Sequence, residues 1–375
     1  MIIAFDAKRA FFNNTGLGNY SRNLLNQLFT FYPEHQYWLY SPSKSYNHKI
    51  KLSSNAKIIT PNSLIGKLFT SYWRSVLING QLIKDKPQIY HGLSNELPFG
   101  ITATKVKTIV TIHDLIFKRY PEWYRPIDVK IYDRKFSYAA QKADMVIAVS
   151  RQTAHDIISY YKVAPEKIKV LYQSCNPLFF RLLDKKKIEE VKQKYALPSQ
   201  YLLYVGTVEE RKNLHRLIEA IQLANIKIPL VVVGRKTDYY EKKVKPLIEK
   251  YHMHQQVFHY ENIENVHLPA FYQGATIFIY PSLFEGFGIP ILEAQASGTP
   301  VLTSTGSCFS EAGGPHSAYA NPLDAEDIAQ KIQNLLNDKE RRINMIEQGR
   351  AYARQFNDKQ CADNLIKIYE QLLGI

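Results

Sequence analysis

Glu285 and Glu293 are two carboxylates, eight residues apart, in a stretch of the chain that combines turn and helix patterns. The segment Glu285-Gly-Phe-Gly288 indicates a glycine-rich turn after a buried strand. Pro290 suits the first position of a helix, because its missing N–H would have no partner there anyway. Glu285 therefore falls in the turn, and Glu293 about one turn into the helix. In a parallel α/β fold, both would face the carboxyl edge of the sheet, where ligands bind.

Several roles are open to this carboxylate pair. Paired carboxylates act as general acid and base in glycosidases. At a glycine turn and a helix start, however, they are better placed to accept hydrogen bonds from sugar hydroxyls, while the N–H groups of residues 286–289 donate to a phosphate or a developing charge. The plainer alternative is that Glu293 is an ordinary first-turn glutamate and the glycines only shape the turn.

A second candidate site is the segment Gly206-Thr-Val-Glu-Glu-Arg211-Lys212-Asn-Leu, which lies between an expected strand and an expected helix. Glycine lets the backbone turn tightly and approach a ligand, and Arg211, Lys212 and the helix N-terminus supply positive charge. This combination suits a diphosphate; the alternative is a βα turn with two solvated cations. Because no Asp-x-Asp pair ends a strand, we expect metal-independent charge neutralisation, no metal ligand and no cofactor.

The first half of the chain offers weaker candidates. Gly16-Leu-Gly18 follows the first expected strand but lacks the third glycine of a dinucleotide motif, so an ordinary turn explains it as well. His113 and Asp114 end a strongly apolar strand, where sites form, and His91 occupies a similar position. A histidine held by local hydrogen bonds is the alternative at both places.

The charge of the chain is concentrated in its first half. Of 375 residues, 48 are Lys or Arg and 34 are Asp or Glu, which gives a net charge of +14. Residues 1–175 carry 24 basic and 11 acidic side chains, a net charge of +13, and residues 176–375 carry +1. A one-sided basic domain favours an anionic partner such as a phosphorylated substrate, an anionic membrane or nucleic acid; a solvated basic face without a partner is the alternative.

Residue patterns and composition indicate whether the chain contacts a membrane and where in the cell it is located. The stretch 64–74 mixes aromatic and basic residues at helical spacing, so it could lie on a bilayer. The alternative is a half-buried helix with a solvated basic face. No stretch of eighteen apolar residues is present, and three distant cysteines favour a reducing compartment. We expect a cytoplasmic protein, with peripheral contact at the inner face of a membrane as an option.

Short apolar strands alternate with helices along the chain, which predicts parallel α/β sheets. In the first half the expected strands are Ile2–Phe5, Tyr37–Tyr40, Lys57–Ile59, Gln88–Tyr90, Lys107–Ile112, Met145–Ala148 and Ile168–Leu171, and the expected helices are Tyr20–Phe31, Leu64–Lys84, Pro126–Ala143 and Arg151–Tyr160, the last capped by Ser150. In the second half the expected strands are Tyr201–Val205, Leu230–Val233, Val257–His259, Ile277–Tyr280 and Pro300–Thr303, and the expected helices are Leu214–Ala224, Tyr239–Tyr251, His267–Tyr272, one from Pro290 and one over Asp358–Leu373.

The length predicts two domains. The polar, proline-bearing segment Gln173–Pro177 is the best linker. We therefore expect one doubly wound domain over residues 1–175 and a second over residues 176–357, with a last helix at 358–373 that packs on one of them.

In these motifs the sequence resembles the retaining glycosyltransferases of family 4, also called glycosyl transferases group 1. Four features match in order and spacing: the Gly16-Leu-Gly18 segment, Val205-Gly206-Thr207 through Arg211-Lys212-Asn213-Leu214, the pair Glu285 and Glu293, and Ser310-Glu311-Ala312-Gly313. The segment before the glutamates, 267–276, is also similar. Two positions depart from the family pattern: Thr207 stands where many members have arginine, and Ser310-Glu311-Ala312 replaces the usual Pro-Glu-Val.

The resemblance implies the GT-B fold, with two doubly wound Rossmann-like domains facing across a cleft and the last helix returning to the first domain. It implies that Glu285 contacts the donor sugar and Glu293 the ribose, that Lys212 and Arg211 neutralise the diphosphate, and that His113 lies near the reacting sugar. The backbone at Gly206, Phe287 and Gly288, together with Gly16 and Gly18, would also line the donor site.

The function implied is transfer of a hexose, with retention, from a nucleotide-diphosphate sugar to a hydroxyl of a glycan or lipid-linked saccharide in surface polysaccharide synthesis. The Arg211-Lys212-Asn213 pattern resembles mannosyltransferases that use GDP-mannose, and a UDP-sugar stays open. The first domain would bind the acceptor and the second the donor. A nucleotide-sugar epimerase of similar build and a basic nucleic-acid-binding protein are the alternatives, although no standard nucleic-acid motif is present.

Overall fold

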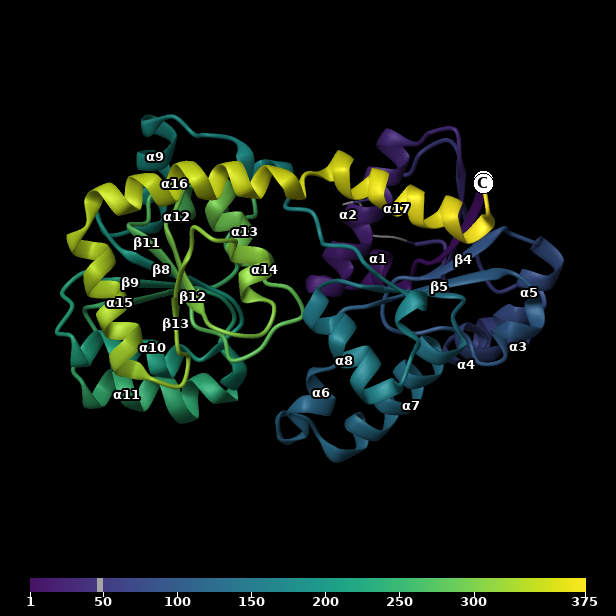
Figure 1. Ribbon diagram of the computed structural model, residues 1–375, viewed down its shortest axis with the longest axis horizontal. Coiled ribbons are helices and arrows are strands. Elements are labelled where there is room, and N and C mark those ends of the chain that lie inside the picture. The colour runs from purple at the N-terminus through teal and green to yellow at the C-terminus, as the bar shows by residue number, and fades with distance from the viewer. Residues whose placement is uncertain (46–49) are drawn as a thin grey trace. The chain divides into compact units, whose positions relative to one another are not determined.

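The computed structural model describes residues 1–45 and 50–375 and divides the chain into two compact units (Figure 1). The first unit combines residues 1–174 with 358–375, and the second covers residues 175–357. The change of unit between Ser174 and Cys175 falls inside the segment Gln173–Pro177 that the sequence indicates as the linker.

The described residues of the first unit form a seven-stranded parallel sheet in the order β3-β2-β1-β4-β5-β6-β7. Its strands are β1 (Ile2–Asp6), β2 (Gln36–Tyr40), β3 (Ala56–Ile59), β4 (Ile89–Gly92), β5 (Lys107–Ile112), β6 (Met145–Ala148) and β7 (Ile168–Val170). Its helices are α1 (Lys8–Phe12), α2 (Gly16–Phe31), α3 (Leu64–Leu68), α4 (Thr70–Tyr72), the π-helical turn η1 (Trp73–Leu77), α5 (Ile78–Asp85), α6 (Ile116–Arg119), α7 (Pro126–Lys142), α8 (Arg151–Tyr161) and α17 (Asp358–Leu373), with short 3₁₀ turns η2 (Ile101–Thr104), η3 (Pro121–Trp123) and η4 (Pro165–Lys167).

The second unit forms a six-stranded parallel sheet in the order β10-β9-β8-β11-β12-β13. Its strands are β8 (Leu202–Val205), β9 (Leu230–Val233), β10 (Val257–Tyr260), β11 (Ile277–Tyr280), β12 (Val301–Ser304) and β13 (Ala318–Ala320). Its helices are α9 (Lys185–Tyr195), α10 (Leu214–Leu223), the π-helical turn η7 (Tyr240–Val244), α11 (Lys245–Lys250), α12 (Leu268–Gln273), α13 (Ile289–Ala296), α14 (Phe309–Gly313), α15 (Ala325–Asn337) and α16 (Lys339–Ala353), with 3₁₀ turns η5 (Pro177–Phe180), η6 (Glu210–Lys212) and η8 (Arg354–Phe356).

Helices cover both faces of the first sheet, as the alternation along β1 shows. Ile3 and Phe5 belong to one apolar core, which α2 and α17 complete, and Ala4 belongs to a second core with residues of α5 and α7. Because successive side chains of a strand point to opposite faces, two cores on one strand require a layer on each side of the sheet. The doubly wound α/β architecture expected from the sequence is confirmed, and so is the capping of α8, where the Ser150 side chain accepts a hydrogen bond from the Thr153 N–H.

The expected helix over Leu64–Lys84 is wrong in one respect, because the chain breaks at Phe69. The backbone of Phe69 has φ −113° and ψ 65°, outside the helical region, and separates α3 from the helical run that starts at Thr70. Gly66 lies against the buried indole of Trp73, so α3 folds back over the start of that run. Arg74 ends the stretch 64–74, which could lie on a bilayer or have a solvated basic face; its side chain is 12% exposed and is paired with Asp6 and Glu96.

The segment Gly16-Leu-Gly18 is the first turn of α2, not a loop before it, so the expected helix start at Tyr20 is corrected to Gly16. The Asn13 side-chain oxygen accepts hydrogen bonds from the N–H groups of Thr15 and Gly18, which extends the helix backwards. Gly18 allows this close approach, since a Cβ there would lie 1.8 Å from the Asn13 carbonyl oxygen. None of the helices formed by the described residues is long and apolar enough to cross a membrane.

The last helix, α17 (yellow in Figure 1), is an integral part of the first unit. Leu365 and Tyr369 belong to the same apolar core as α2. The Tyr369 hydroxyl lies 2.7 Å from His91 Nδ1, and Gln27 Nε2 donates to Asp358 Oδ1 at 2.8 Å. Removal of α17 would therefore open the core of this unit.

We predict that Leu365→Ala lowers the free energy of unfolding of the first unit by about 2–5 kcal/mol, because it leaves a cavity in a closed core. All three tryptophans, Trp38, Trp73 and Trp123, lie in this unit, so tryptophan fluorescence during urea unfolding reports on it alone. Asn364→Ala, an exposed change in the same helix, is the control. An unchanged urea midpoint for Leu365→Ala would contradict the packing of α17 described here.

Candidate functional site

The strand order of the second sheet reverses between β8 and β11, which lie side by side at its centre. The chain moves outward from β8 through β9 to β10, and then returns to β11 and moves through β12 to β13 on the other side. Loops that follow adjacent strands at such a point diverge and leave a crevice, which is where open α/β sheets bind ligands. The segments 206–213 and 281–288 are these two loops.

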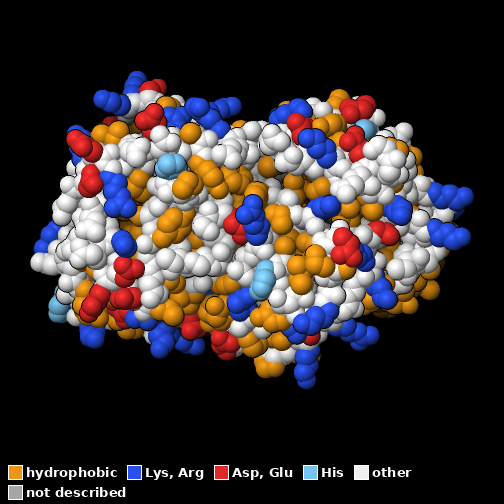
Figure 2. Space-filling model, in the orientation of Figure 1, with side chains coloured by type: hydrophobic (Ala, Val, Ile, Leu, Met, Phe, Trp, Pro, Cys, Tyr) orange, Lys and Arg blue, Asp and Glu red, His pale blue; other side chains and the backbone are white. Residues whose placement is uncertain are grey.

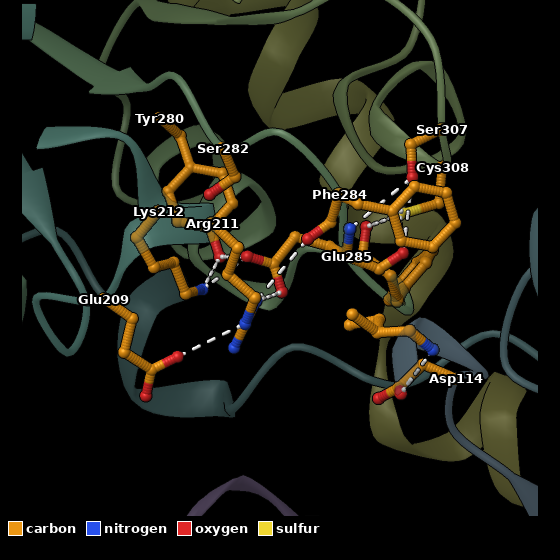
Figure 3. A network of polar contacts seen from close by, with 12 residues as sticks. Asp114, Glu209, Arg211, Lys212, Tyr280, Ser282, Phe284, Glu285, Ser307 and Cys308 are labelled. Atoms are coloured by element: carbon orange, nitrogen blue, oxygen red, sulfur yellow. Dashed lines mark hydrogen bonds and ion pairs between the residues drawn. The ribbon is translucent and has the colours of Figure 1, made fainter. Parts of the chain in front are cut away.

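Three expected site residues meet here in one ionic network (Figure 3). Arg211 Nη1 lies 2.7 Å from Glu285 Oε2, and Lys212 Nζ lies 2.6 Å from Glu285 Oε1. Lys212 and Glu285 are each 8% exposed, so the pair is nearly removed from water. Figure 3 shows both cationic side chains pointing toward the carboxylate that lies between them.

Tyr280, which the sequence pattern predicts only as the end of a strand, completes the network. Its hydroxyl contacts Lys212 Nζ and donates to Glu285 Oε1 at 3.1 Å. Lys212 Nζ also lies over the Tyr280 ring, 4.6 Å from its centre. A polar aromatic residue as the last residue of a buried strand beside a switch point is the pattern that could have identified it.

The electrostatics keep Glu285 ionised. Burial alone would raise the pKa of Glu285, but the Arg211 guanidinium and the Lys212 ammonium together outweigh it and lower that pKa to about 2. Burial lowers the pKa of Lys212, and the Glu285 carboxylate opposes this shift. For Arg211, burial is outweighed by Glu285 and Glu209, which raise its pKa.

Backbone contacts hold the two loops against each other. Gly206 has φ 152°, and a Cβ on Gly234 would lie 1.9 Å from the Gly206 carbonyl oxygen, so two glycines are needed where β8 and β9 end. Asn213, at φ 61°, donates from Nδ2 to the carbonyl of Pro281 at 2.9 Å. The Leu283 N–H donates to the Arg211 carbonyl at 2.7 Å. The backbone that carries Arg211 and Lys212 is therefore fixed by these contacts.

Hydrogen bonds from Cys308 hold the backbone of the glycine turn after Glu285. The Cys308 thiol donates to the carbonyls of Glu285 and Phe287, at 3.2 and 3.0 Å. The Phe287 ring is buried, 5.8 Å from the Phe356 ring, so this residue can offer a ligand only its backbone. Gly288, with φ 108°, is the N-cap residue of α13, and no side chain caps that helix. No pattern in the sequence predicts this role of Cys308, because its partners lie more than twenty residues away in the chain.

Glu293 lies on α13 and has its own partner, separate from the cations. The Tyr272 hydroxyl donates to Glu293 Oε2 at 2.9 Å. Burial raises the pKa of this carboxyl to about 7, and the bond from Tyr272 opposes the rise. The pKa values of the two glutamates therefore lie far apart, although their spacing in the sequence suggests a pair.

His113, Gly16 and Gly18 belong to the first unit. The His113 ring is buried, with Nε2 2.8 Å from the carbonyl of Leu93 and the Tyr20 ring edge-on at 4.5 Å. Burial lowers the pKa of His113 to about 4, so the ring is neutral at physiological pH. His91 is buried between Tyr369 and Thr111, and burial lowers its pKa to about 3. Both histidines therefore have hydrogen-bond partners within the first unit, as the alternative of a histidine held by hydrogen bonds requires.

Comparison with known proteins gives consistent results along the chain. The model of glycosyltransferase family 4 matches residues 15–177, and that of glycosyl transferases group 1 matches residues 185–352. The O-antigen chain mannosyltransferase B of Escherichia coli is 29% identical over 292 residues, which cover 76% of this chain and 75% of that protein.

Solved structures share the fold over the full length. Sucrose-phosphate synthase from Thermosynechococcus elongatus has a TM-score of 0.79 at 20% identity, covering 99% of both chains. Anabaena HepE in complex with UDP has a TM-score of 0.76 at 15% identity, covering 99% of this chain and 100% of that one. These likenesses show that the fold is GT-B.

We predict that Glu293→Gln changes how stability depends on pH. The folded-state pKa of about 7 lies above the ordinary value of 4.5. Glu293 therefore favours the folded state below pH 4.5, and this contribution is lost as pH rises to 7. The wild type should lose on the order of 2 kcal/mol of unfolding free energy relative to the variant over that range.

Urea unfolding followed by circular dichroism at several pH values measures this difference. Glu347→Gln, at an exposed position on α16, is the control and should show no such trend. A wild-type curve parallel to that of Glu293→Gln from pH 4.5 to 7 would contradict the raised pKa.

Proposed function

The chain belongs to glycosyltransferase family 4, the group 1 glycosyltransferases, and we propose that it transfers a hexose from a nucleotide-diphosphate sugar to a hydroxyl of a glycan or lipid-linked saccharide. We further propose that the anomeric configuration is retained and that the product is part of a surface polysaccharide. The observation that carries the proposal is the buried network of Arg211, Lys212 and Glu285 at the switch point of the second sheet.

The less exposed members of the network carry a surplus of positive charge. Arg211 Nε also lies 3.2 Å from Glu209, but that side chain is 41% exposed and therefore screened by water. Without Glu209, the network consists of two cations and one carboxylate, of which Lys212 and Glu285 are buried and Arg211 is 22% exposed. A donor diphosphate would supply the missing negative charge in a site where charge interactions are strong.

The proposed mechanism rests on charge that develops as the glycosidic bond breaks. The leaving diphosphate becomes more negative in the transition state, and Arg211 and Lys212 would stabilise it more strongly there than in the bound donor. The N–H groups near Phe287 and Gly288 and the turn at Gly206 would contact the phosphates and the sugar. The leaving phosphate would accept the proton of the acceptor hydroxyl, and no metal ion would be required.

The carboxylates would orient the donor. Glu285 is fixed from two sides by the cations, so its oxygens keep a constant position for a sugar hydroxyl. Glu293, bonded by Tyr272, would accept from the ribose. From the first unit, we propose that His113 acts as a neutral hydrogen-bonding group near the reacting sugar and that Gly16 and Gly18 allow the backbone to approach the donor.

GDP-mannose is the donor that we propose, with a UDP-sugar as the alternative. Its support is the similarity to an O-antigen mannosyltransferase. The alternative is supported by the fold relative that was solved with UDP. The family matches favour glycosyl transfer over an epimerase or a nucleic-acid-binding protein, because the matching models are those of glycosyltransferases.

We predict that one nucleoside diphosphate raises the thermal unfolding temperature of the protein more than the others in a panel of GDP, UDP, ADP and dTDP.

Glu285→Gln should lower transferase activity by about 10²–10³-fold, because it removes a fixed donor contact and leaves the charges of Arg211 and Lys212 without their carboxylate partner. Lys194→Ala, which removes the exposed ion pair to Glu264 in the same unit, is the control and should keep full activity. Full activity of Glu285→Gln would contradict the role assigned to this residue.

We also propose that the first unit touches an anionic membrane as a peripheral contact. Four apolar side chains of α3 and its end are strongly exposed, at 79% for Leu64, 60% for Ile65, 78% for Leu68 and 63% for Phe69. Figure 2 shows Lys and Arg side chains together with hydrophobic ones over the part of this unit formed by α3, α4 and α5. Exposed apolar residues next to positive charge are typical of surfaces that enter the interface of an anionic bilayer.

Leu68→Glu combined with Phe69→Glu should abolish sedimentation with vesicles that contain anionic phospholipid, and the wild type should lose binding as salt is raised. Ile343→Glu, on the second unit and 55% exposed, is the matched control. Absence of wild-type binding at low salt, or binding that survives the double change, would contradict the contact.

A further inference from the structure

Glu293 is a partly exposed carboxylate that is held by a fully buried tyrosine. It lies on α13, the helix that follows the glycine turn after Glu285, and a ligand can reach its side chain. The Tyr272 hydroxyl, on α12, donates to Oε2 of this carboxylate at 2.9 Å. Among the residues that the structure describes, no cation pairs with Glu293. Its second oxygen, Oε1, can therefore accept a hydrogen bond from a ligand.

The packing around Tyr272 fixes the direction of its hydroxyl. The ring is fully buried, edge-on to Phe179 at 5.6 Å and 5.2 Å from the Phe278 ring. Its backbone carbonyl accepts a hydrogen bond from Thr299 Oγ1 at 2.7 Å. A phenylalanine would fill the same space without the cost of burying a hydroxyl. The hydroxyl thus serves the carboxylate and is not needed to fill the core.

We propose that Tyr272 is a positioning residue for recognition of the donor's ribose. Its hydroxyl holds one oxygen of Glu293, which fixes the rotation of the carboxylate and leaves the other oxygen for a ribose hydroxyl. Because Tyr272 is fully buried, it acts through Glu293 and not by touching the donor. The inference rests on the proposed function, in which Glu293 bonds the ribose, and adds the residue that keeps this carboxylate ready to bind.

The same hydrogen bond affects the charge of Glu293. Burial raises the pKa of the Glu293 carboxyl to about 7, and the bond from Tyr272 opposes this rise. Burial also raises the pKa of Tyr272 well above its ordinary value, so its hydroxyl keeps its proton and remains a donor. An ionised carboxylate accepts hydrogen bonds from ribose hydroxyls better than a protonated one. Acidification below pH 7 should therefore weaken recognition of the ribose.

Other titratable groups nearby do not account for this response. Those carried by the elements packed around α13 and Tyr272 include Tyr280 on β11, Cys175 before η5, Glu311 on α14 and Arg350 on α16. Tyr280 and Cys175 raise the pKa of Tyr272, and none of the four shifts the pKa of Glu293. The pH dependence of ribose recognition should then follow the carboxylate and the hydroxyl that holds it.

The test compares a nucleoside diphosphate with its 2′,3′-dideoxy form, which lacks both ribose hydroxyls. GDP and UDP, each beside its dideoxy form, are titrated calorimetrically into the full-length protein at pH 8. The wild type should bind the ribonucleotide about tenfold or more tightly than the dideoxy form. Tyr272→Phe should reduce this preference by about fivefold and leave the affinity for the dideoxy form unchanged.

Tyr201→Phe is the matched control. Tyr201 is also fully buried in the second unit, and its hydroxyl donates to the Phe271 carbonyl, on α12, at 2.7 Å. This change should leave the preference for ribose intact. In a Glu293→Gln background, Tyr272→Phe should have no further effect on the preference, because the two residues act as one unit. Circular dichroism and unfolding temperature establish that each variant is folded.

The pH profile gives a second readout that a merely structural role would not change. The ratio of the two affinities cancels the titration of the phosphates, which both ligands share. In the wild type this ratio should fall as pH is lowered from 8 to 6, through the pKa of about 7. Tyr272→Phe should move the midpoint of this fall to higher pH, because it removes the bond that favours the ionised carboxylate.

The inference is overturned if the wild type binds both forms of the nucleotide equally, if Tyr272→Phe keeps the ribose preference and its pH midpoint, or if Tyr201→Phe lowers the preference as much. Each of these results leaves the proposed transferase function standing, since the diphosphate still binds. Failure of every nucleoside diphosphate to bind would instead remove the proposed function.

Discussion

The contact on which the proposed donor site depends is the carboxylate of Glu285 held between Arg211 and Lys212. Without it, the two cations would repel each other, and the hydration that Lys212 loses by burial would not be compensated. The carboxylate therefore makes the cationic site stable, and the cations in turn keep the carboxylate ionised. Under the proposed function, Glu285 would serve both as a counterion of the phosphate site and as a fixed acceptor for the donor sugar, in a single geometry.

The rest of the second unit serves to hold this contact still. The parallel sheet brings the ends of β8 and β11 side by side, so Arg211 and Glu285, which are 74 residues apart in the chain, meet. Gly206 and Gly234 let the backbones approach, Asn213 bonds across to Pro281, and Cys308 holds the carbonyls of the glycine turn. Such preorganisation matters because groups already fixed before reaction need no rearrangement when charge develops. The first unit also has an ionic cluster at the switch point of its sheet, where Arg74 pairs with Asp6 and Glu96.

The sequence predicts much of this, because the patterns that carry it are local. Periodicity locates most strands and the helix α17, and the glycine, proline and charge spacing predicts the loops that carry Arg211, Lys212 and Glu285. The expected elements leave out the short strand β13 and the helices α9, α15 and α16. They also miss the break at Phe69, which depends on packing of Gly66 against Trp73. The same limit explains Tyr280, Cys308 and the burial of Arg74. Their partners are distant in the chain, and only the tertiary fold brings them together.

The most direct test of the central claim compares nucleoside diphosphate with nucleoside monophosphate binding by calorimetry, in the wild type and in Lys212→Met. If the buried cations recognise the second phosphate, the wild type should bind GDP or UDP at least about 100-fold more tightly than the matching monophosphate, a difference near 3 kcal/mol. Lys212→Met should lose most of that preference and keep its affinity for the monophosphate. An unchanged preference in Lys212→Met, or an equal loss for both nucleotides, would contradict the account.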